Sequence, residues 1–271
     1  IYCGVIAGGF SGYVADHPRL GWRWLFDLCG VAGMLYALPL ALLLREAPGR
    51  GGVDGTPGAG GVARPSAAGT LAALLGNGSF LLLVLYFTLP ALAGWVVRDW
   101  MPAILRQQFQ LGQGQAGVSA TLYWQLAAIV GAVTGGWLAD RWMRRNLRGR
   151  LYVSALGMAC LIPALFGVGN AGSLATAIAF LALFGLGWGF FDGNNMPILC
   201  QIVRPEWRAT GYGLMNLVSI SCGGFGDWLF GWLRDRHVAL NVIFGAFAGV
   251  ALLSVLIVLL IRPRADLAAA A

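Results

Sequence analysis

Apolar and polar residues alternate along this chain in long blocks. Seven apolar runs, each close to membrane length, occupy 22–44, 80–105, 118–138, 151–168, 174–203, 210–233 and 240–261. A helix needs about 20 apolar residues to cross the hydrocarbon core of a bilayer. Because the backbone polar groups of a spanning segment must be satisfied internally, we predict an all-α membrane protein.

The first apolar run, 1–15, is too short to cross a membrane comfortably. It starts at Ile1 rather than at a methionine, and no positively charged signal-peptide segment precedes it. We expect the sequence to be a fragment that begins inside a helix.

A Gly- and Pro-rich segment, 47–69, separates the first two runs from the last six. Its composition is that of a flexible linker, and the short piece 70–75 is expected to lie along the membrane surface. The predicted divisions are 1–46 with two helices, 47–79 with a cytoplasmic linker and an interfacial helix, and 80–271 with six helices.

Composition supports the membrane interpretation and excludes several classes of protein. The chain is 58% hydrophobic and 11% charged, whereas about a quarter of the residues in soluble domains are charged. All 18 basic residues are arginine, which excludes a P-loop or Schiff-base lysine. The five cysteines lie in apolar runs without metal-binding spacing. We therefore expect no cofactor, no metal site and no nucleic-acid partner.

The polar hairpin 135–150, GGWLADRWMRRNLRGR, is similar to a signature of one transporter family. It resembles the loop between the eighth and ninth helices of the major facilitator superfamily through Gly135, Leu138, Asp140, Arg141, Arg144 and Arg145. A second stretch resembles the matching loop between the tenth and eleventh helices of the family, through Arg204, Pro205, Glu206, Arg208 and Gly211. A third stretch resembles the start of the sixth helix, through Gly21, Trp22, Arg23, Trp24 and Phe26.

The resemblance implies the major facilitator fold, with helices 5–12 of a 12-helix transporter present and the first four missing. In this interpretation 1–46 holds the last two helices of the N-terminal half, and 80–271 is the C-terminal half. It further implies alternating access between two six-helix halves, a monomer at full length, and a bacterial cytoplasmic (inner) membrane.

A second resemblance concerns the substrate. Asp99, Trp100, Pro102 and Leu105 resemble the anion:cation symporter branch, whose organophosphate exchangers carry a phosphate-binding arginine near the position of Gly94. The resemblance implies proton-coupled symport of a small organic anion such as a sugar acid, and the glycine argues against a phosphate ester. A lipid-like or neutral solute remains the alternative.

Charged residues at membrane depth are costly and therefore candidates for function. Arg98 and Asp227 are expected at similar depth, so Arg98 pairs either with Asp227 or with an anionic substrate. Asp192 is the candidate proton-coupling residue, and Asn195 is expected on its helical face. The alternative for each is a purely structural role.

Neutral polar and aromatic residues complete the predicted binding site. Substrate hydroxyls are expected to meet Tyr123, Gln125, Asn195, Asn216 and Ser219, and the deeper tryptophans Trp95, Trp124 and Trp188 are candidates for stacking on the solute. The alternative is that these side chains only join helices to one another.

The hairpin is expected on the cytoplasmic side, because most arginines then lie inside the cell. There it is predicted to act as a gate. Asp140 is predicted to face the N-terminus of the eleventh helix near Thr210, where a carboxylate is stabilised. The gate would also include Gly135, Arg141, Arg144, Arg145, Glu206 and Arg208, with Glu206 pairing to the arginines. Arg148 and Arg150 are assigned only to membrane orientation.

Two other classes of protein are disfavoured. An intramembrane enzyme needs a nucleophile and a base or a metal, and the two histidines, His17 and His237, lie in predicted outer loops. A passive channel needs no Asp/Arg gate. The sequence therefore predicts a secondary transporter and not an enzyme.

Overall fold

The computed structural model describes residues 2–17, 21–44 and 66–264. Within them the chain forms α1 (Tyr2–Ala15), α2 (Gly21–Leu43), α3 (Ala67–Leu75), α4 (Gly78–Phe109), α5 (Gln113–Met143), α6 (Gly149–Gly169), α7 (Leu174–Ile202), the 3-10 turn η1 (Pro205–Trp207), α8 (Arg208–Asp235) and α9 (Leu240–Leu260). Most of the predicted linker 47–69 lies outside the described residues.

The predicted membrane spans are present as helices. In the described ranges α2, α4, α5, α6, α7 and α9 are long and apolar enough to cross a membrane. The run at 210–233 also forms a long helix, α8, of 28 residues, but it does not reach the same apolar standard because charged, polar and glycine residues interrupt it. The short piece predicted at 70–75 is part of α3, which Ser66 caps; its place at the membrane surface remains a prediction.

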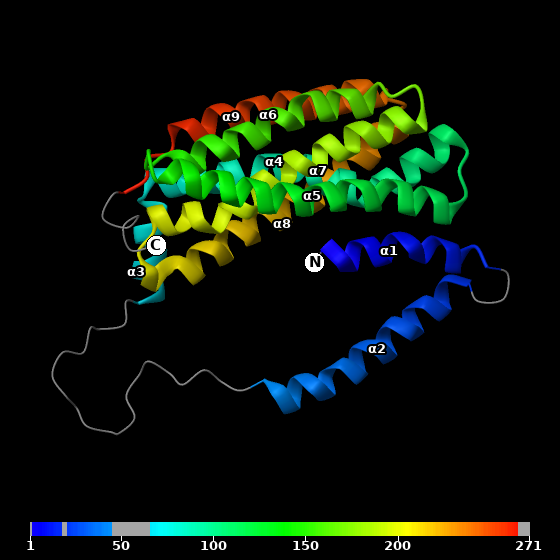
Figure 1. The fold of residues 1–271 in the computed structure, drawn as a ribbon, viewed down its shortest axis with the longest axis horizontal. Coiled ribbons are helices and arrows are strands. Elements are labelled where there is room, and N and C mark those ends of the chain that lie inside the picture. Colours follow the sequence, from blue (N-terminus) through cyan, green and yellow to red (C-terminus); the bar gives the residue numbers. More distant parts are fainter. Residues whose placement is uncertain (1, 18–20, 45–65, 265–271) are drawn as a thin grey trace.

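In the described part of the chain, the contacts of α4, α5, α6, α7 and α9 close into a ring, and these helices lie alongside one another in Figure 1. Around the ring α4 contacts α9, α9 contacts α6, α6 contacts α7, α7 contacts α5, and α5 contacts α4, while α8 packs on α4. α1 lies along α5, and α2 diverges from the bundle with no buried residue among those described. The bundle of α4 to α9 therefore carries most of the packing.

The backbones of α5 and α7 approach each other closely. A β-carbon on Gly185 would overlap the backbone of Trp124, and one on Gly189 would overlap the carbonyl oxygen of Ala128. Gly189 follows Gly185 by four residues on α7, and Ala128 follows Trp124 by four residues on α5. The two helices therefore run in the same direction. Small residues permit this close approach, and it fixes the rotation of α5 and α7 against each other.

Candidate functional site

A cavity of about 290 Å³ opens among α4, α5, α7 and α8. We call it the central cavity, and it is lined by Phe87, Ala91, Gly94, Trp95, Arg98, Trp124, Gln125, Trp188, Phe191, Asp192, Asn216, Ser219 and Ile220. One guanidinium and one carboxylate are thus set among large aromatic surfaces. This combination suits an organic ion with an apolar body.

Arg98 is held in place by two contacts. Its Nε donates a hydrogen bond to Oδ1 of Asp99 at 3.1 Å, and its guanidinium carbon lies 4.2 Å from the ring centroid of Trp95. Among the described residues, the terminal nitrogens Nη1 and Nη2 of Arg98 have no hydrogen-bond partner that competes with a ligand. A planar guanidinium with both terminal nitrogens available binds a carboxylate or similar anion through two parallel hydrogen bonds.

Of the two predicted partners of Arg98, Asp227 forms no ion pair with it in the described residues, and an anionic substrate stays a prediction. Arg98 pairs with Asp99, and Asp227 lies within reach of the side chains of Asp99 and Trp100. Both residues face the same region, as their similar predicted depth implied. Arg98 pairs with Asp99 because the two residues are neighbours on α4, so the Asp99 carboxylate stays close to the guanidinium. The distance to Asp227, in contrast, depends on the position of α8.

The aromatic wall is built from α4 and α7. The ring of Trp188 fills the space beside Gly94, where a β-carbon would overlap its Cη2 and Cζ3 atoms. Trp188 packs edge-on against Phe191 at 5.2 Å, and Phe87 stacks on Phe191 at 5.9 Å. Gly94 therefore provides room for an indole, and an arginine at this position would collide with Trp188.

The α5 wall contains only part of the predicted polar set. Gln125 lines the central cavity and is 1% exposed, whereas Tyr123 is 43% exposed and lies outside the lining. Two residues apart on a helix means a rotation of about 200°, so these two side chains cannot share one wall. Gln125 therefore lines the cavity and Tyr123 does not, and a role for Gln125 in binding the substrate stays a prediction.

The α7 and α8 walls show a similar division. Asp192, Asn216 and Ser219 line the central cavity, and Asn216 donates a hydrogen bond to the backbone oxygen of Tyr212 at 3.0 Å. Their roles in proton coupling and substrate binding stay predictions. Asn195 is 2% exposed and is not among the lining residues. Its amide lies within the helix packing, and neither polar atom of the amide has a hydrogen-bond partner in the described structure.

The hairpin forms a contact that the sequence interpretation missed. Arg150, at the start of α6, donates from Nη2 to Oδ1 of Asp140 at 2.5 Å and from Nη1 to Oδ1 of Asn194 at 3.4 Å. Arg150 therefore links α5, α6 and α7. The signal in the sequence is its place at the end of the hairpin, where α6 begins, whereas the sequence prediction gave Arg150 only a role in membrane orientation.

The predicted partner of Asp140, the N-terminus of α8, is therefore replaced by Arg150. In the described part of the chain neither Asp140 nor Glu206 pairs with Arg141, Arg144 or Arg145, all of which are exposed. The short hairpin brings Arg150 directly to Asp140.

Two other gate residues have structural roles. Arg208 donates to the backbone oxygens of Cys200 and Val203 and so caps the end of α7. Gly135 is buried, and a β-carbon on it would lie 3.0 Å from the Cα atom of Phe190 on α7. A gating function for either residue remains a prediction.

Comparison with known proteins agrees with this architecture. A sequence profile described as Major Facilitator Superfamily matches residues 2–227. An "MFS-type efflux pump" of Mycolicibacterium smegmatis is 28% identical over 80% of this chain and 49% of its own length. "Protein spinster homolog 1" of Rattus norvegicus is 28% identical over 87% of this chain and 48% of its own. The chain spans about half the length of these curated relatives.

A solved structure shares the fold. A crystal structure described as a bacterial homolog to the human lysosomal transporter spinster, in an inward-facing and unoccupied conformation, has a TM-score of 0.65 and 18% identity. The alignment covers 94% of this chain and 66% of the other. The anion:cation symporter branch stays a prediction, because none of these names specifies it. The profile match and the shared fold show that the chain belongs to the Major Facilitator Superfamily, a family of membrane transporters.

Proposed function

We propose that the protein is a secondary transporter for an organic anion with an apolar body, bound in the central cavity. The observation that carries this proposal is the position of Arg98, which lines a cavity with aromatic walls and lies over the Trp95 ring. The anionic group would bind the guanidinium, and the body would pack on Trp188, Phe191 and Phe87.

The lining favours this solute over the other predicted classes. Gly94 and Trp188 leave no second cation beside Arg98 in the central cavity, so a single negative charge suits it better than a phosphate ester. A sugar acid would use Gln125, Asn216 and Ser219 for its hydroxyls. A lipid-like anion would use the aromatic surfaces more fully, and the number of these rings favours it.

Proton coupling is assigned to Asp192. This carboxylate lines the same cavity as Arg98, so its charge acts on the solute that Arg98 binds. Protonation of Asp192 removes a negative charge from the cavity and thereby strengthens binding of an anion. We place the transporter in a bacterial cytoplasmic membrane as a monomer, with the hairpin 135–150 inside, which the arginine distribution supports.

The test uses purified protein in proteoliposomes that enclose a pH-sensitive dye. A panel of aromatic carboxylates, sugar acids and single-chain lipid anions is applied, and both solute and proton movement are recorded. Arg98→Gln should abolish solute movement, and Asp192→Asn should leave solute exchange but remove the proton movement that accompanies it.

Arg236→Gln is the matched control, because Arg236 also lies over a tryptophan, Trp232, at 4.1 Å but outside the central cavity. It should behave like the unmodified protein. Retained transport in Arg98→Gln would refute the assignment of the anion site. Retained proton movement in Asp192→Asn would refute the coupling assignment.

A further inference from the structure

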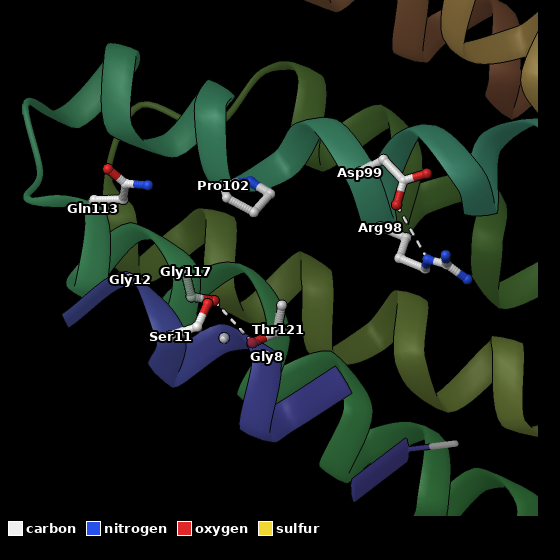
Figure 2. Close-up of a pocket in the computed structure, with 10 residues that line it drawn as sticks. Gly8, Ser11, Gly12, Arg98, Asp99, Pro102, Gln113, Gly117 and Thr121 are labelled. Atoms are coloured by element: carbon white, nitrogen blue, oxygen red, sulfur yellow. Dashed lines mark hydrogen bonds and ion pairs between the residues drawn. The ribbon is translucent and has the colours of Figure 1, made fainter. Parts of the chain in front are cut away.

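A second cavity lies between α1, α4 and α5 (Figure 2). Its volume is about 320 Å³, and its lining consists of Gly8, Gly9, Ser11, Gly12, Arg98, Asp99, Pro102, Gln113, Gly117 and Thr121. We call it the α1 cavity. Figure 2 shows α1 forming one side, with Ser11 near Gly117 and Thr121 of α5, and the Arg98–Asp99 pair at the far end on α4.

The two cavities follow one another along the same pair of helices. On α4 the central cavity ends at Arg98 and the α1 cavity continues through Asp99 to Pro102. On α5 Gln125 lines the central cavity, and Thr121, one turn earlier, lines the α1 cavity. One helical turn is about 5.4 Å, so a small solute group needs to move by only about that distance to pass from one to the other.

Arg98 is the residue that both linings share, and among the described residues it is the sole cation in either of them. We propose that the α1 cavity is a second binding site for the anionic group of the solute, and that the solute passes between the two cavities around Arg98. This proposal rests on the proposed function of the central cavity. The α1 cavity would be an intermediate binding site on the transport path.

The α1 cavity should bind an anion more weakly than the central cavity. Asp99 lines it, and the Asp99 carboxylate already accepts the Nε hydrogen bond of Arg98. An anion on this side therefore meets a like charge and competes for the same guanidinium. The polar side chains of Ser11 and Gln113 offer further hydrogen bonds, while the hydroxyl of Thr121 is donated to the oxygen of Gly117 at 2.8 Å.

Gly8 gives access to the α1 cavity without disturbing the fold. A β-carbon on Gly8 meets no atom within 4 Å, whereas one on the neighbouring Gly9 would overlap Thr121. A cysteine at position 8 therefore reports on the α1 cavity, and a cysteine in place of Ile220, which is exposed in the central cavity, reports on the other.

The experiment measures modification of these single cysteines by an anionic and a cationic methanethiosulfonate in proteoliposomes. The native cysteines are first replaced by serine: Cys3, Cys29, Cys160, Cys200 and Cys222. The rates are normalised to a free thiol. In both Gly8→Cys and Ile220→Cys we expect the anionic reagent to be favoured by about tenfold, the lower end of electrostatic enrichment in a cleft, and Arg98→Gln to remove this preference.

The possible results separate the two proposals. An Arg98-dependent preference at position 220 but not at position 8 overturns the second site and leaves the central site intact. No preference at either position overturns both proposals. Asp99→Asn should raise the preference at position 8 by removing the competing carboxylate, and an unchanged or lower preference there would contradict the stated reason for weak binding.

A second experiment fills the α1 cavity with a larger side chain at position 8. Gly8→Leu should lower the rate of solute uptake at least fivefold while leaving equilibrium binding at the central cavity within about twofold, which is near 0.4 kcal/mol. Gly249→Leu is the control, because Gly249 on α9 is exposed and also has open space around its β-carbon position. Equal uptake rates in the two variants would overturn the proposal.

Discussion

The indole of Trp188 on α7 occupies the space beside Gly94 on α4, so that these two residues exclude any other side chain at position 94. The contact sets the distance between two walls of the central cavity. It also gives a structural reason why position 94 carries no arginine, since the space that a long side chain needs is filled by a ring.

We expect Gly94→Ala to destabilise the protein by about 1–3 kcal/mol, because the added methyl group forces the Trp188 ring to move. Thermal unfolding in detergent measures this change. Trp188→Ala combined with Gly94→Ala should recover part of the loss relative to the sum of the two single changes. Strictly additive losses would show that the two residues do not compete for space.

Arg98→Lys should weaken solute binding by at least about tenfold even though the charge is kept. Lysine cannot form two parallel hydrogen bonds to an anion, and one hydrogen bond to a charged group contributes about 1.5–3 kcal/mol. Isothermal titration with a bound member of the solute panel measures the difference. Binding equal to that of the unmodified protein would show that Arg98 acts as a point charge only.

Gln125→Leu should separate stability from binding. Gln125 is buried, and its Oε1 accepts no hydrogen bond in the described structure. A leucine of similar size removes this unsatisfied group, so thermal stability should stay the same or rise, while affinity for a hydroxylated solute should fall. Tyr123→Leu is the control on the same helix, and its solute affinity should change by less than about twofold. A loss of affinity in Tyr123→Leu and not in Gln125→Leu would reverse the assignment of the α5 wall.

Arg150→Gln should loosen the hairpin more than it destabilises the whole protein. The ion pair with Asp140 is partly exposed, so its contribution to stability is below about 1 kcal/mol. Because Arg150 also contacts Asn194, its loss removes a link between three helices, and amide hydrogen exchange across 140–150 should accelerate. Arg141→Gln is the control and should leave the exchange rates unchanged. Equal acceleration in Arg150→Gln and Arg141→Gln would contradict a specific role of Arg150 in holding the hairpin.

The sequence by itself determined the helices and the breaks between them. Apolar length is a local property, and the backbone of a membrane segment must satisfy its own hydrogen bonds, so each run folds as a helix wherever it is placed. The residues of the hairpin 135–150 also predicted the superfamily. Helical periodicity puts Gln125 and Tyr123 on different faces of one helix, although both were predicted to meet the solute.

Only the tertiary structure decided which side chains meet. The rotation of each helix about its own axis follows from packing such as that of Gly185 on Trp124, and no local pattern specifies it. For this reason the sequence predicted Arg98, Asp192 and Ser219 at one site, with Asp227 or an anionic substrate as the partner of Arg98 and the N-terminus of α8 as the partner of Asp140. The structure pairs them with Asp99 and Arg150, because residues joined by a short stretch of chain reach each other before residues on separate helices do.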